Sequence, residues 1–239
     1  MKEIAILGNG KSLSNIDFTK LECDTMGMCV AFRYWEKVNW YPTYYCCVDY
    51  VVLKSHIEKI KEMVRNKKCK KFLLTKQILC DWYEAKNYES IIFLEDLQQN
   101  KRCLFRYLVD WCSGSAGYVF SLFMGYQKIS LFGIDCNYVE FLPQCKQLQN
   151  GTLEITETPK ENPNYFFNDY QRKGDNYNIP NGTRIHRQSW HDAAFLTAGF
   201  AVVNSRELYV INYNKKENES IRKAIETKEI SEYFKLSGD

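Results

Sequence analysis

The chain has 239 residues, of which 45% are hydrophobic and 26% charged, with 12 glycines and 5 prolines. This composition is typical of a globular protein and excludes a disordered or collagen-like chain. The 32 Lys and Arg residues nearly balance the 29 Asp and Glu residues, so charge gives no indication of a nucleic-acid partner. No apolar run reaches the roughly 18 residues of a membrane span, and the N-terminus does not read as a signal peptide. We therefore expect a cytoplasmic protein.

All ten cysteines fall within the first 145 residues, mostly inside apolar runs such as YYCCVDY. The sequence contains no Cys-x-x-Cys pair, which disfavours a zinc site or a thioredoxin-type motif. Disulfide frameworks belong mainly to small secreted domains. We therefore interpret these cysteines as reduced side chains that pack as small hydrophobes.

The first 142 residues alternate between strand-like and helix-like segments. A buried strand is expected within residues 3–13, where IAIL runs into a glycine-rich turn. Further strands are expected over 26–32, 42–50, 70–75, 90–96 and 128–138, with helices over 51–66 and 115–126. This alternation predicts an α/β fold, with a Rossmann-like, mostly parallel sheet flanked by helices.

Residues 143–185 are rich in Asn, Tyr, Gln, Lys, Pro and Gly and show little periodicity. A stretch of this length inside a compact protein is typical of a functional lid. After it we expect a helix over 186–200, a strand over 201–205, a strand or turn over 207–213 and a charged helix over 219–236. The predicted organisation is a nucleotide-sugar-binding core (1–142), a lid insertion on the acceptor side (143–185) and a segment that completes the core (186–239).

The turn after the first strand reads Gly8-Asn9-Gly10-Lys11-Ser12. It lacks the first glycine of a P-loop, where Ala5 stands, and the third glycine of the dinucleotide motif, where Leu13 stands. What remains is a strand-to-helix turn whose N–H groups and Asn9 amide can face a phosphate or ribose. A tight structural turn is the alternative.

Three further groups are candidates for a ligand site. The helix opening at Cys112 carries small residues, the strand ending at Gly133-Ile134-Asp135 lies where ligands gather in parallel sheets, and Asp49 ends another strand. The candidate nucleotide-binding residues are Gly8, Asn9, Gly10, Ser12, Asp49, Ser113, Gly114, Ser115, Gly133, Asp135 and Asn137. Plain helix capping is the alternative for the serines and aspartates.

The chain has three histidines. His56 lies in a helix that reads as exposed, whereas His186 and His191 flank the junction of the lid and the next helix, where an imidazole can act as a base. The sequence has no His-Glu-x-x-His, Asp-x-Asp or Gly-x-Ser-x-Gly motif. Their absence disfavours a metalloprotease, a metal-dependent glycosyltransferase and a serine hydrolase.

Two blocks, IAILGNGKSLSNIDFTKL and CSGSAGYVFSLFMGYQKISLFGIDCNY, resemble the bacterial sialyltransferases that modify lipooligosaccharides. That family has a strand running into Gly-Asn-Gly-x-Ser-Leu, and a Ser-Gly helix before a strand that ends in Gly-Ile-Asp. The resemblance implies a single-Rossmann, GT-A-like variant of a glycosyltransferase, which inverts the anomeric centre without a metal. Its donor would be a CMP-activated sialic acid, a related nonulosonic acid or Kdo, and no cofactor would be required.

The resemblance also implies roles for individual residues. Gly8, Asn9 and Gly10 would contact the nucleotide phosphate and ribose, Ser113 and Gly114 would bind near the donor, Gly133 and Asp135 would flank the cytidine, and Asp49 falls where the family has a donor-binding Asn. His186 best matches the family's general base, with His191 second. Hydroxyls of Tyr138, Tyr165, Tyr170 or Tyr177, with the charge of Arg172, can stabilise the departing phosphate. Asp110 replaces a family Arg and Asn137 a family Tyr, which leaves a different donor open.

The expected partners are a nucleotide-sugar donor and a glycan or glycolipid acceptor. The basic residues of the last segment could attach the chain loosely to the inner face of the membrane, although a solvated helix is the simpler interpretation. The sequence leaves a homo-oligomer open. Two alternatives to a transferase remain: an ATP-dependent pterin diphosphokinase, disfavoured by the lack of a full P-loop, and a nucleotide-binding module of the same fold without activity.

Overall fold

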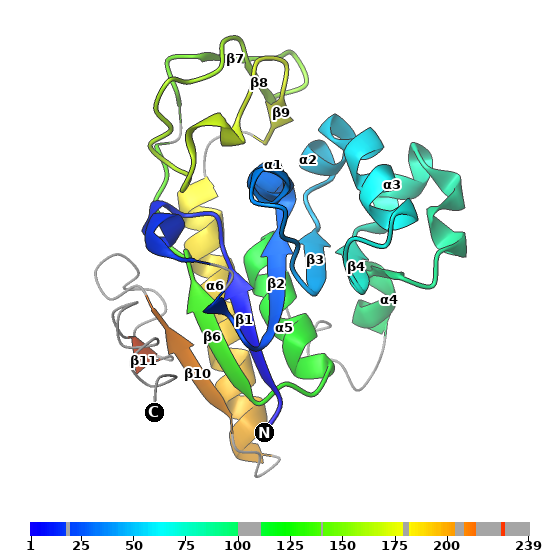
Figure 1. The fold of residues 1–239 in the computed structure, drawn as a ribbon, viewed down its shortest axis with the longest axis vertical. Helices are drawn as coiled ribbons and strands as arrows, with labels where there is room; N and C mark the ends of the chain where they lie inside the picture. Colours follow the sequence, from blue (N-terminus) through cyan, green and yellow to red (C-terminus); the bar gives the residue numbers. More distant parts are fainter. Residues whose placement is uncertain are drawn as a thin grey trace.

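The computed structural model describes residues 1–17, 20–99, 111–139, 141–178, 182–203, 208–213 and 226–227. Its centre is an eight-stranded sheet in the order β11-β10-β6-β1-β2-β3-β4-β5 (Figure 1), in which every neighbouring pair is parallel. The strands are β1 (Glu3–Leu7), β2 (Asp24–Met28), β3 (Tyr44–Cys47), β4 (Lys71–Leu74), β5 (Ile91–Phe93), β6 (Lys128–Phe132), β10 (Tyr209–Asn212) and β11 (Glu226–Thr227). The predicted α/β fold is confirmed.

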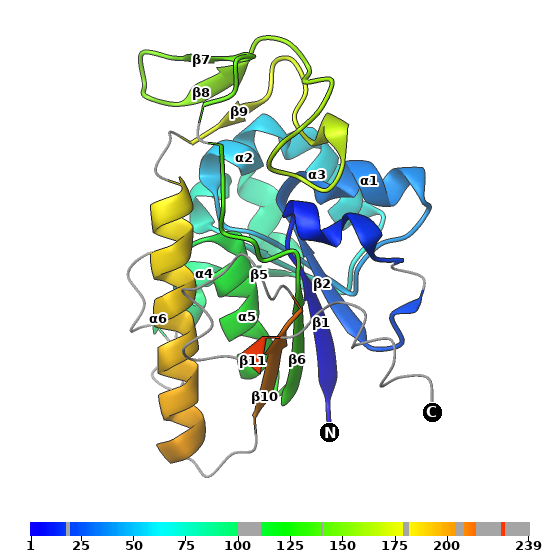
Figure 2. The same ribbon diagram turned by 90° about the vertical axis from the view of Figure 1, so that its left-hand side faces the viewer.

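The strands form because their residues are buried on both faces of the sheet, which favours short continuous apolar runs over alternation. In β1, Ile4 and Ile6 belong to one hydrophobic core and Ala5 and Leu7 to the other. The helices are α1 (Phe32–Lys37), α2 (Tyr50–Ser55), α3 (Ile57–Arg65), α4 (Leu94–Gln99), α5 (Ser113–Phe123) and α6 (Gly182–Val203). Helices α5 and α6 cover the first core and α1 and α3 the second, on opposite sides of the sheet (Figure 2).

The lid contains a small sheet of its own. Strands β7 (Cys145–Gln147), β8 (Leu153–Ile155) and β9 (Asn176–Tyr177) are antiparallel, in the order β7-β8-β9. The lid lies beyond the carboxyl ends of the central strands (Figure 1). Strand β1 lies between β2 and β6. The strands β2 to β5 add to one side of it, and β6, β10 and β11 then add to the other side. The lid therefore covers the point in the sheet where open parallel folds bind ligands.

The five strands expected after the first all end earlier than predicted, and an expected helix is broken. Those over 70–75 and 128–138 end at Leu74 and Phe132. The segment 26–32 stops being a strand at Met28, because Cys29 has a positive φ of 51° and turns the chain into α1. The expected strands over 42–50 and 90–96 end at Cys47 and Phe93, and α2 and α4 begin within them. The helix predicted over 51–66 is two helices, because His56 has a φ of −124° between α2 and α3.

Two predictions near the C-terminus were wrong where the structure describes them. Residues 201–203 continue α6 instead of forming a strand, because intrinsic propensity is a weak preference that the rest of the fold can override. Within the expected charged helix, Glu226 and Thr227 form β11, which pairs with β10; the rest of 219–236 lies outside the described residues. No helix in the described ranges is long and apolar enough to cross a membrane.

Candidate active site

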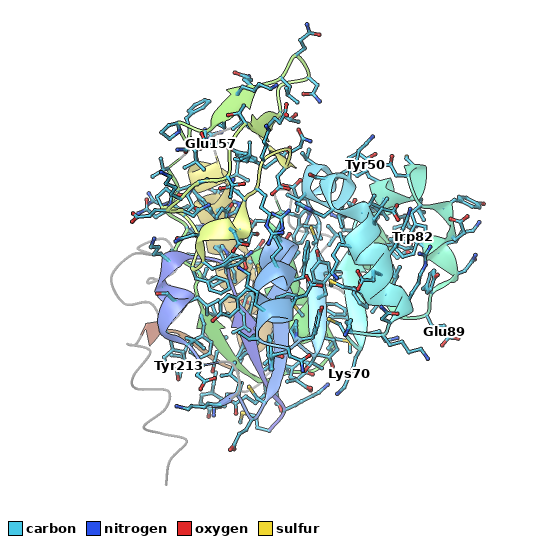
Figure 3. All side chains as sticks on the ribbon, turned by 45° about the horizontal axis from the view of Figure 1, so that its top comes forward. Tyr50, Lys70, Trp82, Glu89, Glu157 and Tyr213 are labelled. Atoms are coloured by element: carbon cyan, nitrogen blue, oxygen red, sulfur yellow. The ribbon has the colours of Figure 1, made fainter. Side chains whose placement is uncertain are left out.

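A cavity of about 470 Å³ lies between the lid and the carboxyl ends of β1, β2, β3 and β6. The turns after these four strands form its floor, the first residues of α5 and α6 close one side, and lid residues between Asn164 and Asn178 close the top. Figure 3 turns this end of the molecule toward the reader, with Glu157 in the lid and Tyr50 at the start of α2. The cavity is large enough for a small-molecule ligand.

The two glycines of the first turn are required by close packing against the turn after β6. The N–H of Gly8 donates to the carbonyl of Phe132 at 2.7 Å, and that of Gly10 to the carbonyl of Gly133 at 2.9 Å. A Cβ on Gly8 would lie 2.3 Å from the Gly133 oxygen, and one on Gly10 would lie 2.4 Å from Cγ of Asp135. The structural-turn interpretation thus accounts for both glycines. Gly8 and Gly133 also line the cavity, whereas Gly10 lies behind it.

Ser12 holds the carboxylate of Asp135. Its hydroxyl donates to Oδ1 at 2.5 Å and its N–H to Oδ2 at 3.0 Å. Asp135 is only 5% exposed but still lines the cavity, while Ser12 does not. Ser12 therefore supports a cavity residue instead of lining the cavity itself.

Asn9 presents an unused acceptor in the cavity. Its Nδ2 donates to the Tyr170 hydroxyl at 2.9 Å and to the Met28 carbonyl at 3.3 Å, whereas its buried Oδ1 has no hydrogen-bond partner. Buried polar atoms in folded proteins are nearly always paired, and an orphan acceptor in a cavity indicates a ligand that donates a hydrogen there. Of the predicted nucleotide contacts, Asn9 is the one with a buried polar atom left to bind.

The first turn of α5 borders the cavity through Ser113 and Gly114. The Ser113 hydroxyl accepts from the N–H of Val48 at 3.1 Å, and so joins the helix to the end of β3. The predicted Ser115 lies behind this turn, where its hydroxyl is 2.5 Å from that of Ser189 on α6. The positive end of the α5 dipole therefore borders the cavity through residues small enough for a ligand to approach.

Asp49 lines the cavity as the N-cap of α2. Its Oδ1 accepts from the N–H groups of Val51 at 2.9 Å and Val52 at 3.3 Å. Burial raises the pKa of this carboxyl above its ordinary value, against the opposing effect of the two amides and the Asn178 side chain. Asp49 therefore caps a helix, as the alternative interpretation predicts, and it also borders the cavity.

The structure brings His186 to the cavity and leaves His191 outside it. The ring of His186 contacts that of Tyr138 edge-to-face, with centroids 4.9 Å apart. Burial raises the pKa of Tyr138 well above its usual value, so its hydroxyl stays protonated as a donor. His191 lies against Phe195, with its Nδ1 3.2 Å from Oδ1 of Asp192 and its side chain 43% exposed.

Three lid tyrosines reach the cavity. Tyr165 and Tyr170 stack with their centroids 3.7 Å apart, and Tyr177 follows in β9. The predicted Arg172 lies outside, paired with Asp169 at 2.6 Å and half-exposed. The predicted Asn137 is exposed and borders a separate cleft of about 610 Å³. The structure thus gathers the tyrosines but neither of these two side chains.

His56 was wrongly expected to be exposed. Its side chain is 8% exposed, lines the cavity and lies edge-to-face on Phe32 with centroids 5.7 Å apart. Burial lowers its pKa to about 4, although the carboxylate of Asp175 lies 3.8 Å away. No sequence signal marked this position, because the apolar spacing of 51–66 reads as one surface helix. Asp175 also borders the cavity, and it too was not predicted from the sequence.

Metal ligands do not cluster in the described part of the chain: no group of three His, Cys, Asp or Glu side chains there could hold an ion. The nine cysteines that the structure describes are reduced thiols and not members of disulfides, as expected. Cys29, Cys112 and Cys136 border the cavity, and burial raises the pKa of Cys112. The polar groups of the site are thus mainly carboxamides, hydroxyls, carboxylates and imidazoles.

No protein-family model matches the chain, and no curated protein matches it in sequence. Solved structures do match it in fold. The sialyltransferase CstII from Campylobacter jejuni, in complex with the substrate analogue CMP-3FNeuAc, matches with a TM-score of 0.57 at 14% identity, over 95% of this chain and 86% of that one. CstII in complex with a trisaccharide acceptor and CMP gives 0.55 at 12% identity, over 94% and 85%. The monofunctional α-2,3-sialyltransferase Cst-I gives 0.53 at 14%, over 92% and 82%. The chain therefore has the fold of these Campylobacter jejuni sialyltransferases.

Proposed function

We propose that this protein is a glycosyltransferase that moves sialic acid, a related nonulosonic acid or Kdo from a CMP-activated donor to a hydroxyl of a cell-surface glycan. The observation that carries the proposal is the unpaired Oδ1 of Asn9, which is buried in a cavity at the carboxyl edge of a parallel sheet. A nucleotide sugar offers hydroxyl and amino hydrogens to such an acceptor. The fold shared with transferases solved with CMP and with a trisaccharide acceptor supports the same assignment.

In this proposal the nucleotide lies across the turns after β1 and β6. Gly8 and Gly133 let it approach the backbone, Asp135 and Asn9 accept its hydrogens, and the first turn of α5 faces its phosphate. Asp49 borders the sugar end of the cavity. Gly10, Ser12 and Ser115 act one layer behind, by holding Gly133, Asp135 and α5 in place.

The transfer is a single displacement with inversion. The acceptor oxygen bonds to the anomeric carbon while the bond from that carbon to the phosphate oxygen breaks, and its electron pair leaves with CMP. The acceptor proton passes to His186, whose ring lies at the cavity beside Tyr138. Hydroxyls of Tyr138, Tyr165 and Tyr177 donate to the charge that grows on the phosphate, in a site that the lid shields from water. This chemistry requires no metal ion.

The donor is tested by a thermal-shift screen of CMP, CDP, UDP, GDP and ATP, each with Mg²⁺ and with EDTA. A ligand at a hundred times its Kd that binds the folded state alone adds about 2.7 kcal/mol of stability. We expect CMP to raise the Tm equally in EDTA, and the effect to be lost in Asn9→Ala. Stabilisation by ATP with Mg²⁺ alone would contradict the proposal and favour a kinase.

The base is tested by matched histidine variants. In His186→Asn we expect transfer from CMP-sialic acid or CMP-Kdo to fall about 10²- to 10⁴-fold with CMP affinity retained, as for loss of a general base. His191→Asn is the control and should keep both, because its ring lies outside the cavity. Full activity in His186→Asn would refute the assigned role.

Where the acceptor is lipid-linked, we propose that the enzyme works at the cytoplasmic face of the membrane.

A further inference from the structure

A buried ion pair joins the lid to the core. Arg33 on α1 meets Asp175 in the lid through two hydrogen bonds, Nη1 to Oδ2 at 2.5 Å and Nη2 to Oδ1 at 2.9 Å. The two side chains are only 11% and 13% exposed. Such a fork-on-fork contact is strong and directional, unlike a solvated surface pair. The contact fixes where the end of the lid lies.

The same guanidinium also holds the lid at a second point. Nη1 of Arg33 donates to the backbone carbonyl of Tyr170 at 2.7 Å, and the Asp175 carboxylate accepts from the N–H of Arg172 at 2.7 Å. The next residue, Asn176, donates from its N–H to the hydroxyl of Ser55 at 3.0 Å. One core arginine therefore holds the segment from Tyr170 to Asp175 as a unit.

That segment carries the side chain that orients Asn9. The Tyr170 hydroxyl accepts from Nδ2 of Asn9 at 2.9 Å and from the N–H of Val30 at 3.2 Å, and its ring stacks on Tyr165. With Nδ2 directed at Tyr170, the Oδ1 of Asn9 is the end of the amide left unpaired. Arg33 does not line the cavity, but it is joined through Tyr170 to a residue that does.

We propose that Arg33 is a positioning residue: its pair with Asp175 holds the lid over the cavity and, through Tyr170, sets Asn9 for the donor. The inference rests on the proposed function for the identity of the ligand. The contacts between Arg33, Asp175 and Tyr170 do not depend on it. The lid position and the donor affinity can therefore be measured separately.

His56 lies beside the ion pair, so its pKa responds to the charges of Arg33 and Asp175. Its Nε2 lies 3.8 Å from Oδ1 of Asp175, and its ring contacts Phe32. Asp175 raises its pKa, while burial and the charges of Arg33 and Arg172 lower it to about 4. Removing Arg33 takes away its own charge and the ion-pair partner of Asp175, while the Arg172 N–H still bonds the carboxylate, so the His56 pKa should rise. Removing the Asp175 charge should lower it further.

The experiment compares Arg33→Met and Asp175→Asn in the full chain by NMR titration of the imidazoles. With three histidines in the sequence, the His56 signal is assigned by elimination with His191→Asn and His186→Asn. Arg33→Met should raise the His56 pKa by about one to three pH units, as expected for an unshielded carboxylate nearby. Asp175→Asn should leave no His56 titration above pH 4. Opposite shifts in the two variants follow from the charges of Arg33 and Asp175 and would show that the pair forms beside His56 in solution.

Both variants should also loosen the lid. Tryptic cleavage at Lys146, Lys160 and Lys173 should become several-fold faster, and CMP affinity should fall about tenfold or more. The matched control is Lys37→Met, which removes a half-exposed α1–lid pair with Asp169 and should change all three readouts little. If a variant fails to fold, the exchanged pair Arg33→Asp with Asp175→Arg tests the same contact.

The outcomes separate the two proposals. Unchanged lid cleavage and an unchanged His56 titration in both variants would overturn the positioning role, whatever the ligand. Faster cleavage and opposite His56 shifts, with no CMP binding by the wild type, would support the role of the Arg33–Asp175 pair in holding the lid. The same result would refute the proposed donor. Faster cleavage with full CMP affinity would overturn the link from Arg33 to Asn9.

Discussion

Replacing Gly8 with alanine tests the close packing of the two turns beneath the cavity. The new methyl group would lie 2.3 Å from the Gly133 oxygen and 2.6 Å from Cδ1 of Ile134, well inside van der Waals contact. The Gly133 contact is to backbone, so relief requires the two turns to separate. Separation weakens the bonds from Gly8 to Phe132 and from Gly10 to Gly133.

The expected cost is the sum of two effects. Overpacking costs about 1–3 kcal/mol, and each weakened hydrogen bond adds about 0.5–1.5 kcal/mol. With two weakened bonds, Gly8→Ala should therefore lower the free energy of unfolding by about 2–6 kcal/mol. For a chain of this length, that corresponds to a Tm drop of roughly 4–24 °C. Urea denaturation and differential scanning calorimetry measure the two quantities.

Gly125→Ala is the comparison variant, in which the added methyl group contacts nothing. Gly125 has a φ of 85°, and an alanine methyl group there would have no atom within 4 Å, so the substitution costs only backbone strain, about 1–2 kcal/mol. If Gly8→Ala cost no more than Gly125→Ala, the close contact between the two turns would be refuted.

Three other predictions concern stability. Ser12→Ala removes both the hydroxyl donor and the support of the buried Asp135 carboxylate, so it should cost about 1.5–3 kcal/mol and weaken ligand-induced stabilisation, as measured by urea titration with and without CMP. Ser115→Ala leaves the Ser189 hydroxyl without its 2.5 Å partner and should lower the free energy of unfolding by about 1–3 kcal/mol. In a double-mutant cycle, the variant with both Ser115→Ala and Ser189→Ala should lose less stability than the two single variants added together. His56 has a folded pKa of about 4 against an ordinary 6.5, so the unfolded chain binds the extra proton between these values. Its contribution to stability is present above pH 6.5 and falls by up to about 3 kcal/mol as the pH drops to 4; in His56→Gln this part of the pH dependence should be absent.

The sheet was predictable because its signal is local. The run IAIL is wholly apolar, and KISLF is apolar or buried at every residue after Lys128, which is typical of strands buried on both faces. The breaks were harder to predict: nothing in MGMCVAF shows that Cys29 takes a positive φ, since that conformation is imposed by the packing around it. The same applies to the split at His56, where the apolar spacing of one helix continues into the next.

The candidate site was predictable where it depends on strand ends and not where it depends on the lid. Asn9 and Asp135 follow predicted strands, and parallel strands place their carboxyl ends at one edge. Arg33 and Asp175 are 142 positions apart, and neither belongs to a recognisable motif. Pairings of this kind arise from the tertiary fold, so no local pattern can reveal them. The ion pair that holds Arg172 outside the cavity, with Asp169, likewise could not be predicted, so Arg172 was expected inside.

The position of β1 at the centre of the sheet has a consequence for synthesis of the chain. Its residues pair on one side with β2, for example Ile4 with Asp24, and on the other with β6, for example Glu3 with Lys128. Until residues 128–132 have left the ribosome, one edge of this largely apolar strand has no neighbour. Contacts of such long sequence separation slow folding, and an unpaired strand edge invites association with other chains. The nascent chain should therefore carry one unpaired edge of a largely apolar strand until residues 128–132 have been made and can pair with β1.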